Sequence, residues 1–260
     1  VFMISKSNQV LMNDFVITIG TVNGSGSQSA NNILVKTLFR MGLPVCGKNL
    51  FPSNIAGLPT WFSIRVSAEG HLSRRSPNDI VVAMNLSTLQ QDLNSTRSGG
   101  VFIYNSDLKG IGLKFPDDIQ TVGIPFNQLL KDVTDSIKLK KLLTNMVYVG
   151  LLARLLEVDR DTLNETIQDF FAEKKGIIEP NLNAINAGWN YVENELNNLQ
   201  FPFKTQKIPN GNKGKILIDG NSAAAMGLVF GGCTFMSWYP ITPSSSLAES
   251  FTNYCQLYRK

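Results

Sequence analysis

The sequence predicts an α/β protein whose larger part is Rossmann-like, because three patterns follow one another along the chain. Residues 15–42 have the pattern of a buried strand, a glycine-rich loop and a helix. Four more apolar runs of strand length lie between residues 61 and 124. After residue 126 the apolar residues recur at helical spacing, so we expect a helical C-terminal portion after the sheet.

The opening unit starts with the apolar run Phe15–Ile19, which is typical of a buried strand. The loop GTVNGSGSQS follows at residues 20–29, and a helix is expected after it because apolar residues recur at helical spacing. The next segment, GKNLFPSNIAGLP at residues 47–59, is rich in turn formers and is expected to be a loop. The further predicted strands are 61–67, 80–84, 101–104 and 121–124.

Three helices are predicted after residue 126. The first spans residues 139–156, the second begins with Asp161 as N-cap and ends at Gly176, and the third spans residues 182–199. The most apolar stretch, residues 142–158, contains polar and charged residues, so we expect a buried helix there and no membrane span.

Residues 201–215 are rich in Pro, Gly and Lys and predict a linker between two domains. The part beyond the linker, 216–260, is expected to begin with a strand at 216–218. A helix at 222–230, an apolar strand-like run at 233–238 and a helix from Ser246 are expected to follow. Because 45 residues are too few to bury a core of their own, we expect this domain to be incomplete.

The composition excludes several classes of protein. The N-terminus shows no secretory leader, and the three cysteines, Cys46, Cys233 and Cys255, are too far apart for a disulfide framework, a zinc site or an iron–sulphur site. The single histidine, His71, argues against a Ser/His/Asp triad and a two-histidine metal site. We therefore expect a cytoplasmic protein with reduced cysteines.

The excess positive charge is concentrated near the N-terminus. Residues 15–75 carry six Lys or Arg residues and one Glu, which gives this segment a net charge of +5. The whole chain has a net charge of +4, so the remaining residues together carry a net charge of −1. Such a field attracts phosphates, carboxylates or an acidic partner, although an ordinary solvated basic face would have the same composition. Without a dense basic run interleaved with aromatic residues, nucleic acid is not the expected partner.

The glycine loop Gly20-x-x-x-Gly24-x-Gly26-x-x-Ser29 is the first motif with chemical potential. Backbone N–H groups at the start of the following helix can hold a phosphate. A dinucleotide site also needs an acidic residue about 20 positions later, where this chain offers Lys48 and Asn49. Anion binding by Gly24, Gly26, Lys48 and Asn49 is one interpretation, and a glycine turn that only lets the helix pack on the strand is the other.

The second motif is the run Tyr239, Pro240, Ile241, Thr242, Pro243 and Ser244. Prolines on both sides of Thr242 restrict the backbone and hold its hydroxyl on a stiff loop. If the loop follows a strand, that hydroxyl lies at the carboxyl end of a sheet, where open α/β folds bind ligands. A rigid structural turn remains the alternative.

Residues 220–249, GNSAAAMGLVFGGCTFMSWYPITPSSSLAE, resemble the start of the pyrimidine-binding domain of 2-oxoacid:ferredoxin oxidoreductase alpha subunits, in which YPITP is a signature. Residues 15–105 are similar to the gamma domain that many members carry ahead of it. This similarity rests on the glycine loop, on GKNLFPSNIAGLPTWFSIR and on PNDIVVAMN, and it extends through NLNAINAGWNY. The resemblance implies a gamma domain at 1–200 and an incomplete pyrimidine-binding domain at 216–260.

The resemblance also implies a chemistry. Enzymes of this family use thiamine diphosphate to decarboxylate a 2-oxo acid such as pyruvate or 2-oxoglutarate. They form acyl-CoA from coenzyme A and pass electrons through an iron–sulphur cluster to ferredoxin. A partner beta subunit is expected to hold the diphosphate, its Mg²⁺ and the cluster. No nucleic acid or membrane partner is expected.

The resemblance further implies roles for individual residues. Thr242 matches the threonine that contacts the substrate, with the rest of residues 239–244 around it, and Lys48 becomes a candidate for binding the acid or coenzyme A. The carboxylate that activates the cofactor in the family lies past residue 260, and Glu249 is not assigned that role, so we expect the chain alone to be inactive. Two alternatives stay open: a non-catalytic binding or assembly module derived from the gamma domain, and a nucleotide-dependent dehydrogenase.

Overall fold

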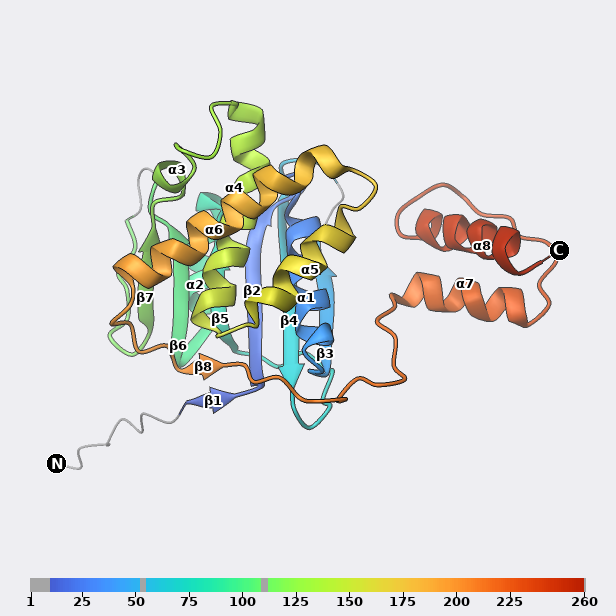
Figure 1. The fold of residues 1–260 in the computed structure, drawn as a ribbon, viewed down its shortest axis with the longest axis horizontal. Coiled ribbons are helices and arrows are strands. Elements are labelled where there is room, and N and C mark those ends of the chain that lie inside the picture. The colour runs from blue at the N-terminus through green and yellow to red at the C-terminus, as the bar shows by residue number, and fades with distance from the viewer. Residues whose placement is uncertain (1–9, 52–54, 109–111, 260) are drawn as a thin grey trace. The chain divides into compact units, whose positions relative to one another are not determined.

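The computed structural model describes residues 10–51, 55–108 and 112–259, which divide into two compact units after Lys213 (Figure 1). Each unit has its own hydrophobic cluster. The first unit contains the six-stranded sheet and most of the helices, and the second contains two helices.

The sheet of the first unit is mixed, with the strand order β3-β4-β2-β5-β6-β7. Strands β2, β5, β6 and β7 are parallel, whereas β4 pairs antiparallel with both β2 and β3. The central strands are buried on both faces, which explains their continuous apolar runs. Their bounds are β2 (Asp14–Val22), β3 (Val45–Leu50), β4 (Pro59–Ser67), β5 (Asn78–Ala83), β6 (Thr96–Asn105) and β7 (Gln120–Ile124).

The predicted fold class is confirmed, but one strand of the six-stranded sheet was missed. The segment expected to be a loop contains β3, an edge strand that pairs with β4 from Val45↔Val66 to Leu50↔Trp61. Its residues include Gly47, Lys48 and Asn49, which are poor strand formers, so the partner strand and not local propensity sets its conformation.

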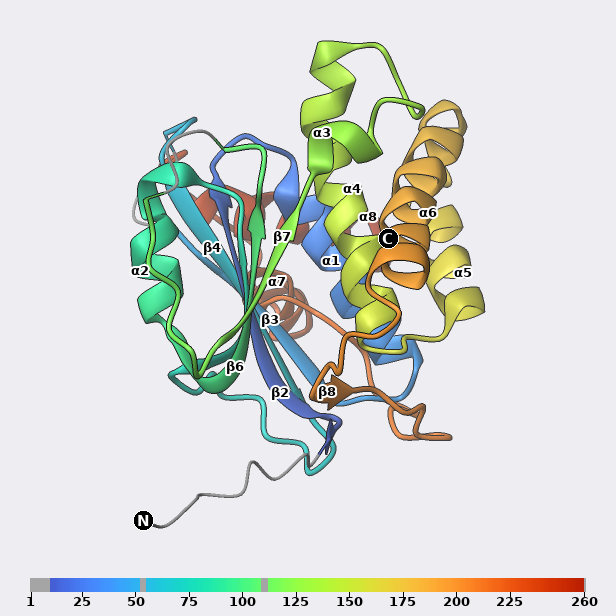
Figure 2. The ribbon, with the colours of Figure 1, turned by 90° about the vertical axis from the view of Figure 1, so that its left-hand side faces the viewer.

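Helices cover the two faces of the sheet unequally (Figure 2). Helix α2 packs on one face, and α1 and α4 pack on the other, with α5 and α6 outside them. The bounds are α1 (Ser27–Arg40), α2 (Leu89–Asn94), α3 (Phe126–Leu129), α4 (Ile137–Leu155), α5 (Arg160–Phe170) and α6 (Ile178–Glu195), with short 3₁₀ turns at Leu86–Thr88 and Lys175–Ile177.

Helix α4 is the buried helix that its apolar sequence predicts, and within the part of the chain that the structure describes no helix is long and apolar enough to cross a membrane. Where it crosses α6, each of the two helices has a glycine that faces the backbone of the other helix. A Cβ at Gly150 would collide with the carbonyl oxygen of Ile185, and a Cβ at Gly188 would collide with that of Val147. The two glycines therefore let the backbones of α4 and α6 approach closely.

The start of α5 differs from the prediction. Asp159, and not Asp161, is the N-cap: its Oδ1 accepts a hydrogen bond from the Thr162 backbone N–H at 2.8 Å and another from the Thr162 hydroxyl. Thr162 lies three residues after Asp159, the spacing that a capping carboxylate requires. The helix ends at Phe170 instead of Gly176.

The predicted linker 201–215 is for the most part a structured element of the first unit. Strand β8 (Phe203–Lys204) pairs parallel with β1 (Leu11–Met12), and the Phe203 ring is buried against Phe15. Further along, the Asn212 side chain donates to the carbonyls of Phe39 and Leu43 at the end of α1. A composition rich in Pro, Gly and Lys does not reveal these long-range contacts.

The second unit consists of α7 (Gly220–Phe230) and α8 (Ser244–Tyr258), which pack through Ala225, Val229 and Phe251. The strands predicted at 216–218 and 233–238 are not formed. A strand needs a neighbour for its backbone groups, and the described residues of this unit contain none. Several of its large apolar side chains are exposed, including Phe230, Phe235 and Tyr239.

Candidate functional site

The candidate site lies at the glycine loop, which joins the carboxyl end of β2 to the start of α1. The carboxyl ends of β5 and β6, which are parallel to β2, lie on the same side of the sheet and contribute Met84 and Asn105. Ligands of open α/β folds bind at this edge, at the point where the connections after two neighbouring strands run to opposite faces of the sheet. One cavity opens on each side of the loop.

Two glycines give the loop its conformation. Gly24 has a φ of 82° and Gly26 a φ of 81°, values that other residues adopt only with strain. At Gly26 a Cβ would also lie 2.8 Å from Cδ2 of Leu142 on α4. Glycine is therefore favoured at Gly26 by the backbone angle, and a larger residue would also displace the Leu142 side chain.

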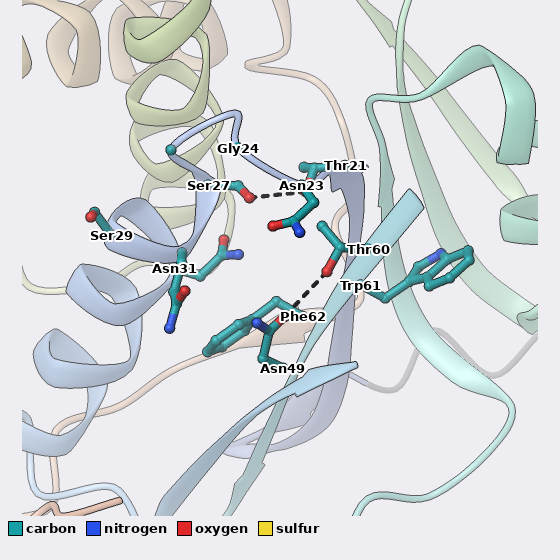
Figure 3. Close-up of a pocket in the computed structure, with 12 residues that line it drawn as sticks. Thr21, Asn23, Gly24, Ser27, Ser29, Asn31, Asn49, Thr60, Trp61 and Phe62 are labelled. Atoms are coloured by element: carbon teal, nitrogen blue, oxygen red, sulfur yellow. Dashed lines mark hydrogen bonds between the residues drawn. The ribbon is translucent and has the colours of Figure 1, made fainter. Parts of the chain in front are cut away.

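The first turn of α1 faces a cavity of about 370 Å³ (Figure 3). The N-cap residue is Gly26, which has no side chain to bond the first N–H groups, and the first turn contains no acidic residue. These N–H groups and the positive end of the helix dipole favour an anion. The cavity is lined on this side by Ser27, Gln28 and Ser29.

The rest of this cavity is neutral and rich in hydrogen-bonding groups (Figure 3). Asn23, Asn31, Asn49 and Thr60 line it, and the Thr60 hydroxyl donates to Oδ1 of Asn49 at 3.3 Å. The Trp61 side chain points to the other face of β4. Neutral amides and hydroxyls can bind sugars, amides and phosphate oxygens, but they add no net charge.

The second cavity, of about 520 Å³, is more basic. Lys138 and Lys141 line it from the first turns of α4, together with apolar groups from Val22, Met84 and Leu142. Our sequence analysis missed both lysines. The run Ile137–Leu142, IKLKKL, contained a signal in its three lysines at the start of a helix, but only the tertiary fold brings them to the glycine loop.

Two polar side chains of α4 contact the site from the protein interior. Nδ2 of the buried Asn145 donates to the Ser25 carbonyl at 2.8 Å, and the hydroxyl of the fully buried Tyr148 donates to Oδ1 of Asn31 at 2.8 Å. Burial raises the pKa of Tyr148 well above its ordinary value, so this hydroxyl stays protonated.

A buried carboxyl lies on the opposite face of the sheet. Asp92 accepts hydrogen bonds from Nε1 of Trp61 at 2.6 Å and from the Thr88 hydroxyl at 2.9 Å. Burial raises the pKa of Asp92, and these two hydrogen bonds oppose the shift only in part. Asp92 thus holds the indole of Trp61 on the face away from the first cavity.

The residues predicted to bind an anion are only partly brought together. Gly24, Gly26 and Asn49 line the first cavity, but Lys48 lines neither cavity. In β3, Asn49 is paired with Phe62 and Lys48 with Ser63, so the Lys48 side chain points to the opposite face of the sheet. Lys48 is also part of a strand and not of the expected flexible loop.

Half of the six basic residues in the segment 15–75 are paired with acidic residues outside it. Arg40 pairs with Asp169 at 2.6 Å, Arg65 pairs with Asp14, and Arg75 bonds both Asp14 and Asp79. Burial alone would raise the pKa of Asp14, but the hydrogen bonds and charges of Arg65 and Arg75 outweigh it and hold that pKa below its ordinary value. Counting charges along the sequence therefore overstated the field in this region.

In the second unit, residues 239–244 form a hydrogen-bonded loop. The Ser244 hydroxyl bonds the carbonyls of Tyr239 and Ile241 at 2.8 and 2.7 Å. Nδ2 of Asn221, at the start of α7, donates to the Pro243 carbonyl at 2.8 Å. Thr242 is exposed on this loop. The stiffness expected from the two prolines thus has a second source, although the loop does not follow a strand as predicted.

Among the residues that the structure describes, no group of three or more His, Cys, Asp or Glu side chains could hold a metal ion. The three cysteines are free and partly buried.

Comparisons with known proteins were made for the whole chain. A family model described as pyruvate ferredoxin/flavodoxin oxidoreductase matches residues 16–191. The alpha subunit of 2-oxoacid:ferredoxin oxidoreductase 2 from Aeropyrum pernix is 25% identical over 91% of this chain and 42% of its own length. The chain therefore spans about two fifths of that curated relative.

Two solved structures resemble the chain. The 2-oxoglutarate:ferredoxin oxidoreductase of Magnetococcus marinus, with 2-oxoglutarate, coenzyme A and succinyl-CoA bound, matches with a TM-score of 0.80 and 25% identity over 94% of this chain and 42% of that chain. The gamma subunit of a keto/oxoacid ferredoxin oxidoreductase from Geobacter sulfurreducens matches with a TM-score of 0.54 and 17% identity over 68% of this chain and 96% of its own, which supports the fold alone.

Proposed function

The chain belongs to the 2-oxoacid:ferredoxin oxidoreductase alpha-subunit family, and from this premise we propose that it forms part of an enzyme that oxidises a 2-oxo acid to acyl-CoA and CO₂ and reduces ferredoxin. The observation that carries the proposal is the family match over residues 16–191, which includes the glycine loop and both cavities beside it. The candidate oxo acids are 2-oxoglutarate, which is bound in the Magnetococcus relative, and pyruvate.

In this proposal the glycine loop binds the phosphates of coenzyme A. The first-turn N–H groups of α1 point at the ligand, and the helix contributes roughly half a positive charge at this end. Lys138 and Lys141 supply two full positive charges on the other side of the loop. The neutral amides of the first cavity suit the uncharged parts of the same molecule, which offer amide and hydroxyl groups.

The oxo acid is assigned to the loop of the second unit. The Thr242 hydroxyl can donate a hydrogen bond to a carboxylate or carbonyl oxygen. A donor fixed before the substrate arrives stabilises developing negative charge better than one that must be ordered on binding. The hydrogen bonds of Ser244 and Asn221 to the loop carbonyls keep the backbone on both sides of Thr242 in place.

The electron-transfer and decarboxylation cofactors do not fit the described residues of this chain. Holding an iron–sulphur cluster or the Mg²⁺ of thiamine diphosphate requires grouped thiolates or carboxylates, and the described residues form no such group. We assign these groups to a partner beta subunit, and the role of this chain is to bind and orient the two substrates.

The proposed activity is tested with the full-length alpha subunit assembled with its beta partner. Ferredoxin reduction that requires both a 2-oxo acid and coenzyme A is the expected result, and parallel assays with pyruvate and 2-oxoglutarate identify the acid. An assembled complex with its cofactors in place that oxidises no 2-oxo acid would contradict the proposal and favour a non-catalytic binding or assembly module.

The coenzyme A site is tested separately, by calorimetry on the 260-residue chain. Replacing Lys138 and Lys141 together with Ala is expected to weaken binding at least about tenfold at 0.1 M salt and to reduce its salt dependence. The matched control is the double replacement of Lys174 and Lys175, two exposed lysines that line neither cavity. Because exposed charges are screened within about 10 Å at 0.1 M salt, the control should bind within twofold of the unaltered chain. Equal losses in both double variants would refute the site.

A further inference from the structure

Helix α4 contacts the glycine loop and the first turns of α1 through two hydrogen bonds from buried side chains, those of Asn145 and Tyr148. We propose that Asn145 and Tyr148 are positioning residues: Asn145 locks the orientation of the peptide between Ser25 and Gly26, and Tyr148 orients the Asn31 amide, so that both present N–H donors to the ligand. This inference rests on the proposed binding of coenzyme A at the loop, but it concerns residues that act through the loop peptide and through Asn31.

The argument for Asn145 starts from the geometry of one peptide group. In a trans peptide the C=O and the N–H point in opposite directions. Nδ2 of Asn145 holds the Ser25 carbonyl at 2.8 Å and so directs it toward α4. The N–H of Gly26 must then point away from α4. The cavities agree with this direction, because Ser25 and Asn145 line the second cavity, whereas Gly26 lines the first.

A lock is needed because this peptide could easily rotate. It joins Ser25 to Gly26, and glycine adopts positive and negative φ with similar ease. A rotation of the peptide would turn the Ser25 carbonyl toward the first cavity, and a carbonyl oxygen repels an anion. The Asn145 amide, which is 4% exposed and also bonds the Leu142 carbonyl at 3.2 Å, opposes that rotation from a rigid helix.

Tyr148 acts on the next turn of α1. Its hydroxyl stays protonated and donates to Oδ1 of Asn31 at 2.8 Å. With Oδ1 occupied, the NH₂ group of Asn31 is the part of the amide directed away from Tyr148, and Asn31 lines the first cavity. Asn145 and Tyr148 are three residues apart and therefore lie on one face of α4. The close crossing with α6 at Gly150 fixes the position of this part of the helix.

The test compares Asn145→Leu with a matched control. Leucine keeps the branched shape and the neutrality of the side chain and removes the hydrogen-bonding amide, and Asn145→Ala replaces it if the leucine variant does not fold. The control is Asn13→Gly at the opposite end of β2. Asn13 is also a buried asparagine that ties a distant segment, through two bonds to the Gln206 backbone, and glycine accepts its φ of 54°.

Coenzyme A affinity and the backbone amide resonances of residues 24–27 are measured for each variant. Asn145→Leu should weaken binding at least tenfold and shift those resonances. Tyr148→Phe should weaken binding at least threefold without shifting them, and Asn13→Gly should bind within twofold even if it melts lower. Binding of Asn145→Leu within twofold of the unaltered chain, or unchanged resonances at residues 24–27, overturns the inference. If the unaltered chain binds no coenzyme A, the proposed ligand is wrong, and the resonances alone then decide whether the lock exists.

Discussion

The crossing of α4 and α6 provides a quantitative test of the packing in the first unit. In Gly150→Ala the new Cβ would lie 2.7 Å from the carbonyl carbon and 2.9 Å from Cα of Ile185. Ordinary contacts between carbon atoms are about 3.5–4.0 Å, so the helices must separate by about 1 Å. The opposing atoms belong to the backbone and cannot rotate out of the way.

The expected cost follows from this separation. Overpacking of a well-packed core typically costs about 1–3 kcal/mol, and a radial gap of this size removes roughly a quarter to a half of the dispersion energy of the contacts beside it. Alanine regains about 1 kcal/mol through its better helix propensity. Because the opposing atoms are backbone and several buried side chains on both helices lose contact, we place the cost at the upper end of that range, a net destabilisation of about 2 kcal/mol, or roughly 4–8 °C in melting temperature for a unit of this size.

The assay is calorimetric or fluorescence-monitored unfolding, and two of the three tryptophans, Trp61 and Trp189, report on the first unit. Gly176→Ala is the control, because a Cβ there meets nothing within 4 Å. A Gly150→Ala variant that melts within about 2 °C of the control would show that the helices do not approach as closely as described.

Three further substitutions test other parts of the molecule. Burial raises the pKa of Asp92 above its ordinary value of 3.8, so the wild-type fold loses stability as the pH rises from that value through the folded pKa. Asparagine does not titrate, and Asp92→Asn should therefore gain stability relative to wild type between pH 4 and pH 8. A difference in melting temperature that does not change with pH would contradict this prediction. Thr242→Val should lower turnover of the assembled enzyme at least about tenfold, equivalent to roughly 1.4 kcal/mol, at unchanged melting temperature, whereas normal turnover would return Thr242 to a structural role. Lys48→Ala removes a charge that faces away from both cavities, so it should leave the KM for coenzyme A unchanged, and a raised value would return Lys48 to the anion-binding residues.

Local patterns were sufficient to predict most of the first unit. The strand, loop and helix around Gly24 and Gly26 were predictable because the glycines, the apolar run before them and the helical repeat after them all act over neighbouring residues. The buried character of α4 was predictable for the same reason. These features do not depend on which distant segment packs against them.

Features that depend on distant partners could not be predicted. Strand β3 forms because β4 pairs with it, so Lys48 was expected in an anion-binding loop, whereas it lies in a strand and faces away from the first cavity. Lys138 and Lys141 come to the glycine loop from more than 100 positions away in the sequence. Arg40 finds its counterion at Asp169.

The segment 201–215, which follows α6, also determines where the first unit ends. The family match stops at residue 191, but the Phe15 ring packs against Phe203, and the last carbonyls of α1 are bonded by Asn212. A gene fusion, fission or exchange that kept only the matching core would leave an apolar ring exposed and remove the Asn212 hydrogen bonds to the carbonyls of Phe39 and Leu43. The natural breakpoint therefore lies beyond Asn212, at the division after Lys213, and any recombination upstream of it would have to replace these closing contacts.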